Sequence, residues 1–216
     1  MKRILIITPH PMDETLGAGG TILKHAANGD EVHWLILTKP EESKWGKDKI
    51  EKNSQEISKV AQKYKVKSFR RLNFLQDSMD ENASKELTEI LKGTFELIKP
   101  NIIYLPYGNT LDKDCNIAFR ASLKAIETFK IKIQRILCYE VVSYLDFASE
   151  AFNPNVYTDI SEYIDQKLEI MNIYEEEVQG YPMPKSTVNI QSLAKVRGAA
   201  IGTEYAEAFM LVKEIC

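Results

Sequence analysis

The sequence predicts a three-layer, doubly wound α/β domain of the Rossmann-like type, with a mostly parallel sheet and a C-terminal extension of helices and strands. Short apolar runs of strand length alternate four times with longer segments whose apolar residues recur at helical spacing. The run at 31–38, EVHWLILT, is apolar over most of its length, as expected of a parallel strand that is covered on both faces.

The expected elements follow one another as one domain over residues 1–216, without a long linker or an internal repeat. Strands are expected at residues 3–8, 31–38, 66–72, 101–105, 135–139, 156–159 and 205–212. Helices are expected at residues 15–27, 48–64, 83–99, 115–129, 161–178 and 188–201. Gly29 ends the first helix at a left-handed cap, Pro100 stops the third, and Ser161 resembles an N-cap.

The apolar side chains of each expected helix fall on one face. This holds for Leu16, Ile22 and Leu23; for Ile50, Ile57 and Val60; for Leu87, Leu91 and Phe95; and for Ala118, Ala121 and Ile126. Right-handed crossovers between parallel strands then place the loops after strands one, two, four and five at one edge of the sheet. That edge is where ligands bind in open α/β sheets.

Composition excludes several classes of protein. The formal net charge is −3 and no basic stripe is present, which argues against a nucleic-acid partner. The longest apolar runs, at 4–7 and 34–37, are far too short to span a bilayer. The N-terminus lacks the pattern of a secretory signal, and the three irregularly spaced cysteines indicate reduced thiols. The expected location is therefore the cytoplasm.

The loop after the first strand carries the first candidate site residues. His10 lies between Pro9 and Pro11, and Asp13 and Glu14 follow. An imidazole and two carboxylates on such a loop can hold a divalent cation or move protons. The two prolines stiffen the loop, which lowers the entropy cost of holding the side chains in place.

The loop after the fourth strand carries Asp112, Asp114 and Cys115. In this fold loops one and four lie side by side, so these groups are expected to meet the first loop. A hydrolytic zinc site needs three protein ligands and an open position for water. His10 and Asp13 suit two of these positions and Cys115, as a thiolate, a third. Asp112 could accept a proton, and Asp114 could orient a ligand.

Each of these residues also has a purely structural interpretation. Asp13 or Thr15 could cap the first helix, and Asp112 or Asp114 could cap the helix that begins near residue 115. Cys115 could be a buried inert thiol. A dinucleotide-binding loop is excluded by spacing, because the third glycine position is Ile22.

The segments PHPMDE at 9–14 and GAGGT at 17–21 resemble the first motif of the LmbE-like, or PIG-L, de-N-acetylase family, (Ala/Pro)-His-Pro-Asp-Asp-Glu followed by Gly-x-Gly-Gly-Thr. Residues 139–141, 152–156 and 205–209 are similar to the family as well. The resemblance implies zinc-dependent removal of acetyl groups from N-acetylglucosamine-type sugars or glycosides in cytoplasmic glycan assembly. The expected partner is a small N-acetylated sugar.

The resemblance also implies residue roles. Zinc would be held by His10, Asp13 and the last histidine of a later His-x-Asp-His motif, and the first aspartate of the first motif would be the general base. In this chain the base position is Met12. The later motif reads DKDC at 112–115, so both of its histidines are replaced, and no histidine follows His33. Loss of a general base costs about 10²- to 10⁴-fold in rate.

Two hypotheses follow. In the first, the chain is an enzyme with a rebuilt site: His10, Asp13 and Cys115, or the carboxylates at 112 and 114, hold zinc or another divalent metal, and Asp112 or Glu14 accepts the proton. In the second, the chain is a sugar-binding or scaffold homologue that does not catalyse the reaction or bind metal. A nucleotide-binding protein is a weaker third hypothesis. A homo-oligomer and an N-acetylated glycoside of unspecified aglycone are compatible with each of the first two.

Overall fold

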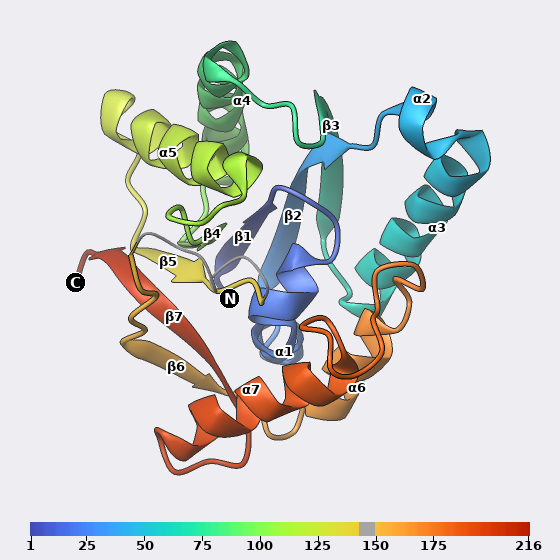
Figure 1. Ribbon diagram of the computed structural model, residues 1–216. Helices are drawn as coiled ribbons and strands as arrows, with labels where there is room; N and C mark the ends of the chain where they lie inside the picture. Colours follow the sequence, from blue (N-terminus) through green and yellow to red (C-terminus); the bar gives the residue numbers. More distant parts are fainter. Residues whose placement is uncertain (143–149) are drawn as a thin grey trace.

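The computed structural model describes residues 1–142 and 150–216. The described chain forms one seven-stranded sheet in the order β3-β2-β1-β4-β5-β7-β6 (Figure 1). Its strands are β1 (Arg3–Thr8), β2 (Glu31–Lys39), β3 (Ser68–Leu75), β4 (Ile102–Pro106), β5 (Arg135–Tyr139), β6 (Val156–Asp159) and β7 (Ala206–Glu214). The first five are parallel, and β7 runs antiparallel to both of its neighbours, β5 and β6.

Helices cover both faces of the sheet (Figure 1). They are α1 (Asp13–Ala27), α2 (Glu42–Trp45), α3 (Lys47–Lys63), α4 (Glu81–Ile98), α5 (Lys113–Thr128), α6 (Ile164–Met171) and α7 (Thr187–Ala199). Successive side chains of a strand point to opposite faces. In β1, Ile4 and Ile6 accordingly join the core under α1, α3, α6 and α7, whereas Leu5 and Ile7 join the core under α4 and α5. The predicted three-layer α/β fold is confirmed.

Most expected elements are present with shifts of a few residues at their ends. The helix expected over 161–178 is the main exception, because α6 covers only Ile164–Met171 and turns follow it. Past that end the chain turns, and the buried Tyr174 donates its hydroxyl proton to Glu14 at 2.7 Å. The segment between β2 and α3 also contains the short helix α2, for which no helix was expected.

The strand order brings three loops to one end of the sheet. The neighbours β1 and β4 run parallel, with Ile6 opposite Tyr104. The loops that follow them, which contain His10 and Asp112, therefore leave at the same edge. The strand β2 flanks β1 on the other side, and Leu75 at the end of β3 pairs with Lys39 at the end of β2. The loop after β3 is thereby drawn toward this edge as well.

Close packing fixes α1, the helix that follows the first loop. A Cβ atom on Gly17 would lie 2.2 Å from a ring carbon of Tyr139, so only glycine fits at this position. The buried ion pair between Lys167 and Glu207, at 2.7 Å, reaches the same helix. Glu207 accepts hydrogen bonds from two backbone N–H groups of α1, and Lys167 donates to the carbonyl of Leu16. This contact fastens the C-terminal extension to the element that carries the first motif.

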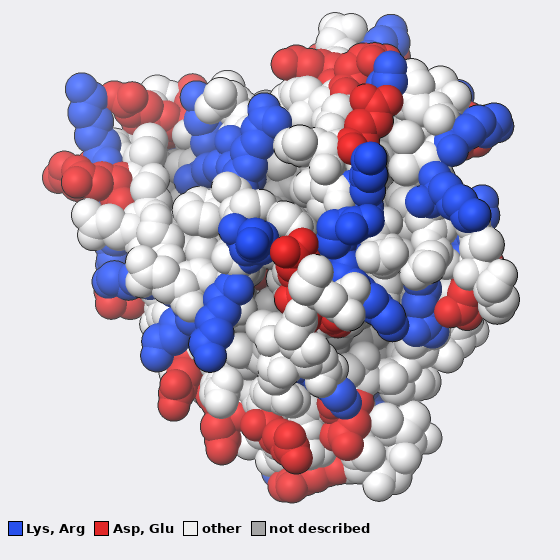
Figure 2. Space-filling model, turned by 180° about the vertical axis from the view of Figure 1, so that it is seen from behind, with Lys and Arg blue, Asp and Glu red and all other residues white. Residues whose placement is uncertain are grey.

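The surface carries both signs of charge. On the face seen in Figure 2, Lys and Arg side chains are interspersed with Asp and Glu. Among the described residues, none of the helices has the length and apolar character needed to cross a membrane.

Candidate functional site

His10 is held so that one ring nitrogen faces the end of the sheet. Its Nδ1 lies 2.9 Å from the hydroxyl oxygen of Thr38, and that hydroxyl donates its proton to the carbonyl of Pro9 at 2.8 Å. Since a hydroxyl has one proton, Thr38 must accept from Nδ1–H. In the neutral imidazole the lone pair is then on Nε2, which is the arrangement of a metal-binding histidine.

The Nε2 atom of His10 faces the second loop. It lies 3.4 Å from Oδ2 of Asp112 and 3.7 Å from Oδ2 of Asp114. The residue is 5% exposed, and Nε2 makes no hydrogen bond. Burial lowers the pKa of His10, but the carboxylates of Asp112, Asp13 and Asp114 outweigh burial and raise this pKa to about 9. The surroundings of Nε2 therefore favour a positive charge.

Asp13, at the start of α1, supplies a second atom without a partner. Its Oδ2 accepts a hydrogen bond from the backbone N–H of His10 at 3.2 Å, and its Oδ1 is buried with no hydrogen-bond partner. Burial raises the pKa of Asp13 to about 7. An imidazole nitrogen and a carboxylate oxygen without hydrogen-bond partners are donors that suit a divalent cation.

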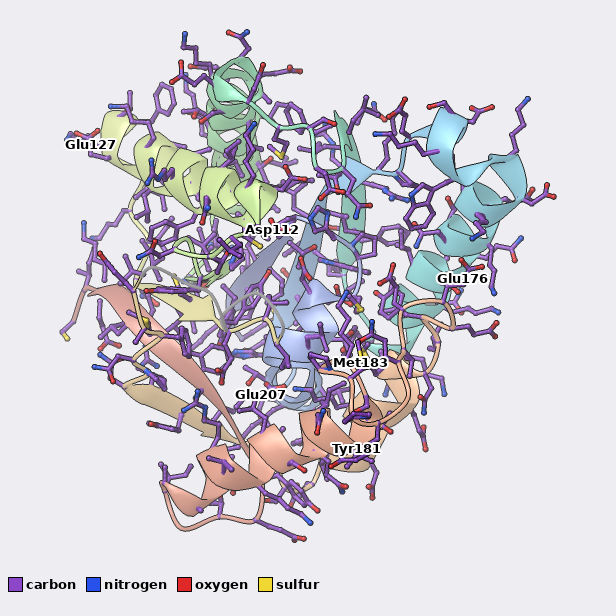
Figure 3. All side chains as sticks on the ribbon, viewed as in Figure 1. Asp112, Glu127, Glu176, Tyr181, Met183 and Glu207 are labelled. Atoms are coloured by element: carbon purple, nitrogen blue, oxygen red, sulfur yellow. The ribbon has the colours of Figure 1, made fainter. Side chains whose placement is uncertain are left out.

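Asp112 is both a helix cap and a neighbour of His10. Its Oδ1 accepts from the backbone N–H of Cys115 at 2.6 Å, which caps α5, while its Oδ2 faces the imidazole. Figure 3 shows Asp112 at the start of α5, above the ends of the central strands. The structural and the functional interpretations therefore both apply to this residue. Cys115 is 1% exposed, and burial raises the pKa of its thiol well above the ordinary value.

Asp114 fixes the loop after β3. Its Oδ2 accepts from the backbone N–H of Asp77 at 2.8 Å, and its Oδ1 accepts from that of Met79 at 3.3 Å. The carboxylate is almost completely buried. Asp114 thus determines where the side chain of Asp77 lies.

Glu14 fixes the first loop. Its carboxylate accepts from the backbone N–H of Met12 at 3.0 Å and from the hydroxyls of Thr15 and Tyr174, each at 2.7 Å. Burial raises the pKa of Glu14 to about 7. Met12 itself is 2% exposed and has a φ of 89°, so a buried thioether stands where a base would be needed.

Asp77 is a candidate that the sequence analysis missed. One ligand atom from each of His10, Asp77 and Asp112 can be chosen so that all lie within 4.8 Å of one another. The segment 76–82, QDSMDEN, contains three acidic residues, and nothing in its pattern distinguishes Asp77 from Asp80 or Glu81. The signal that could have pointed to it is topological, since the loop follows a parallel strand.

Comparison with protein families gives one match. The model of the family described as PIG-L, GlcNAc-PI de-N-acetylase, matches residues 5–126. That span runs from β1 to α5 and contains both loops of the site.

Two curated relatives align over most of the chain. A probable N-acetyl-α-D-glucosaminyl L-malate deacetylase of Bacillus anthracis is 21% identical over 80% of this chain and 80% of its own length. The diacetylchitobiose deacetylase of Thermococcus kodakarensis is 23% identical over 100% of this chain and 85% of its own length.

Solved structures share the fold. A conserved protein of Thermus thermophilus superposes with a TM-score of 0.83 at 22% identity, covering 100% of this chain and 97% of that one. The 4-carboxy-2-hydroxymuconate hydratase of Pseudomonas putida superposes with a TM-score of 0.78 at 19% identity, covering 100% and 98%. The same fold therefore carries more than one reaction, and the family is shown by the sequence match over more than half of the chain: the chain belongs to the PIG-L, or LmbE-like, deacetylase family.

Proposed function

We propose that the chain is a metal-dependent hydrolase of N-acetylglucosamine-type sugars or glycosides, in which Asp112 replaces the base that is missing at position 12. The observation that carries this proposal is the 3.4 Å distance between Oδ2 of Asp112 and Nε2 of His10. It puts a carboxylate beside the retained histidine, in a family whose curated relatives are named as deacetylases of such sugars.

The proposed roles follow from the contacts. His10 and Asp13 would hold the cation with their unpartnered Nε2 and Oδ1. The third ligand is either Cys115 or a carboxylate at 112 or 114, the two alternatives that the sequence left open. A cation held there, zinc in the family's pattern, would supply Lewis-acid polarisation of the acetyl carbonyl and of the attacking water. Asp112 would take a proton from that water as the water oxygen bonds to the acetyl carbon, and would return the proton to the nitrogen as the C–N bond breaks, which gives acetate and a free amine.

Asp112 carries the negative charge that a proton acceptor needs. Burial raises its pKa, but His10 and the N–H of Cys115 outweigh burial, so the pKa of Asp112 is lowered. Its carboxylate is therefore ionised at neutral pH. Glu14 and Asp114 are the other carboxylates that the sequence proposed for the reaction. Through their hydrogen bonds, Glu14 fixes the loop after β1 and Asp114 fixes the loop after β3.

A second candidate function is supported by Met12. Its thioether is buried in the core cluster and cannot take a proton, so the family's own base is lost. Since that loss costs about 10²- to 10⁴-fold in rate, the chain would then be a sugar-binding homologue without turnover. We propose the same cytoplasmic setting, glycan or glycoside assembly, for both candidates, and a homo-oligomer stays a prediction.

Acetate release tests the two candidates. Metal-loaded protein is incubated with N-acetylglucosaminyl malate, N-acetylglucosaminyl inositol or diacetylchitobiose, alongside Asp112→Asn, which keeps the size of the side chain and can still cap the helix. Turnover that falls at least about 100-fold in the variant supports the proposed role of Asp112. Sugar binding by calorimetry with no acetate release supports the second candidate, and neither binding nor release overturns both.

A further inference from the structure

We propose that Asp77, on the loop after β3, is a ligand of the cation in this cleft, together with His10 and Asp112. With Asp13, the donor set would then be one imidazole and carboxylates, without a thiolate, which suits Mn²⁺ or Mg²⁺ in addition to Zn²⁺. This inference rests on the proposed function, because it concerns the cation of the same site.

The backbone holds Asp77 at the cleft by two hydrogen bonds. Gln76 donates its N–H to the carbonyl of Lys39 at 3.1 Å, which continues the pairing between β3 and β2. Asp77 then adopts a φ of 60°, in the left-handed region, and donates its own N–H to the buried carboxylate of Asp114. Both oxygens of Asp114 accept hydrogen bonds from this loop, one from Asp77 and one from Met79. Asp114 is therefore a positioning residue for Asp77.

One pair of the three candidate ligand atoms already has the spacing of a cation site, and the third atom lies near this pair. All three lie within 4.8 Å of one another, and His10 Nε2 is 3.4 Å from Asp112 Oδ2. A cation with ligand bonds of about 2.0–2.2 Å places adjacent ligands about 3–3.5 Å apart. His10 is only 5% exposed. Its Nε2 has no hydrogen-bond partner and faces the carboxylate of Asp112.

Charge favours the same occupant. The buried carboxylates of Asp13 and Asp114 and the half-buried carboxylate of Asp112 gather around one imidazole, and the exposed Asp77 lies beside them. Like charges that are partly withdrawn from water are costly unless a positive charge compensates them. A divalent cation supplies that charge at the atom that lacks a hydrogen bond.

The donor set also bears on the choice of metal. Thiolate and imidazole ligands favour Zn²⁺, whereas carboxylate oxygens suit Mg²⁺ and Mn²⁺. With Asp77 in place of Cys115 as the third ligand, the affinity gap between Zn²⁺ and Mn²⁺ narrows. Asp112 keeps its proposed role as a proton acceptor, because Oδ2 would bind the cation while Oδ1, which accepts one hydrogen bond from Cys115, has a second lone pair.

Titration with Mn²⁺, followed by electron paramagnetic resonance of the free ion and by thermal shift, tests the inference on three variants. Asp77→Asn removes the charge, and asparagine tolerates the left-handed backbone. Asp80→Asn is the matched control, because Asp80 caps α4 from the same loop and asparagine caps as well. Cys115→Ser tests the rival third ligand.

Binding of Mn²⁺ should weaken at least about tenfold in Asp77→Asn and stay unchanged in Asp80→Asn and Cys115→Ser. Unchanged Mn²⁺ binding in Asp77→Asn would overturn the inference, as would a thiolate charge-transfer band in the Co²⁺-loaded protein that Cys115→Ser abolishes. If Mn²⁺ binding depends on Asp77 but no acetate is released, only the proposed hydrolysis fails. If acetate is released and Asp77→Asn binds Mn²⁺ normally, only this inference fails.

Discussion

The imidazole of His10 and the carboxylate of Asp112 face each other at 3.4 Å across the gap between the loops after β1 and β4. In this pair a residue retained from the family's first motif meets a residue that replaces a histidine of the later one. The contact shows that the two loops still meet after these replacements. Relative to the family's motifs, the site lacks the aspartate at position 12 and the histidines at positions 112 and 115.

Restoring the family's residues should therefore restore its reaction. The triple variant Met12→Asp, Asp112→His, Cys115→His is expected to release acetate from N-acetylglucosaminides about 10²- to 10⁴-fold faster than the same protein without the base. Aspartate suits the backbone at position 12, because Asp and Asn are enriched at positive φ, and φ there is 89°.

The matched control for the restored reaction is the triple variant that carries Met12→Asn. Asparagine accepts the same backbone but cannot take a proton, so the difference between the two variants isolates the base. Equal and negligible rates from two folded, zinc-loaded proteins would show that the pocket no longer admits these sugars.

The meeting of the two loops could be predicted from the sequence, because strand–helix alternation and right-handed crossovers place β1 beside β4. Asp77 could not be predicted. Its position depends on a hydrogen bond from its N–H to Asp114, far away in the sequence, and its backbone conformation is left-handed. The sequence also could not predict which ring nitrogen of His10 carries the proton, because this follows from the contact of Nδ1 with Thr38 on β2.

In the C-terminal extension, too, some features could be predicted from the sequence and others could not. Its strands were predicted from short apolar runs, and β6 was placed at the correct residues. The extent of α6 was not, because the helical pattern continues past Met171 whereas the chain turns there. Tertiary contacts such as the hydrogen bond from Tyr174 to Glu14 stabilise that turn, and periodicity carries no information on them.

The buried pair of Lys167 and Glu207 gives a prediction about stability. The side chain of Glu207 is 3% exposed. In Lys167→Met it would keep its hydrogen bonds from two backbone N–H groups but lose the positive charge that compensates it. Removing one partner of a buried pair costs about 3–5 kcal/mol. The free energy of unfolding from urea denaturation should fall by that amount.

An exposed ion pair provides the comparison. Lys52 lies 3.0 Å from Glu175, with side-chain exposures of 42% and 69%, so Lys52→Met should leave the free energy of unfolding nearly unchanged. Adding Glu207→Gln to Lys167→Met should recover part of the loss, because the uncompensated charge is removed. A Lys167→Met protein as stable as the wild type would show that the pair is not needed to hold the extension on α1.

Two glycines should respond in opposite directions to alanine. In Gly17→Ala the new methyl group would meet the ring of Tyr139 at 2.2 Å and the backbone oxygen of Glu140 at 2.7 Å. Overpacking of this kind costs about 1–3 kcal/mol. Gly93, in the interior of α4, has nothing within 4 Å of the same position. There alanine should stabilise the protein by up to about 1 kcal/mol through helix propensity.

Thermal or urea denaturation of the two variants measures the effect of overpacking at Gly17 and of helix propensity at Gly93. The chemical change, glycine to alanine, is the same in both. Gly17 also lies in a helix, so propensity alone would predict stabilisation at both positions. Destabilisation only at Gly17 shows that contact with β5 outweighs propensity there. Stabilisation of both variants would contradict this prediction. It would mean that the ring of Tyr139 can move away from the new methyl group, although Tyr139 is completely buried.

His25, near the end of α1, gives a prediction about pH. Its Nδ1 lies 2.8 Å from a carboxylate oxygen of Asp30 and its Nε2 lies 3.0 Å from the hydroxyl of Tyr104. Burial lowers the pKa of His25 below its ordinary value, and the opposing effect of Asp30 is smaller. The unfolded chain, with a pKa near about 6.5 at this residue, therefore binds the proton more readily than the folded one.

It follows that His25 makes the protein less stable as the pH falls below about 6.5, down to the folded-state pKa. Above that range the imidazole is neutral in both states and has no such effect. The measurement is urea denaturation at pH 8 and at pH 5.5 for the wild type and for His25→Gln, which keeps a polar group but cannot titrate. The wild type should lose more stability than the variant between these two pH values, and equal losses would contradict the lowered pKa of His25.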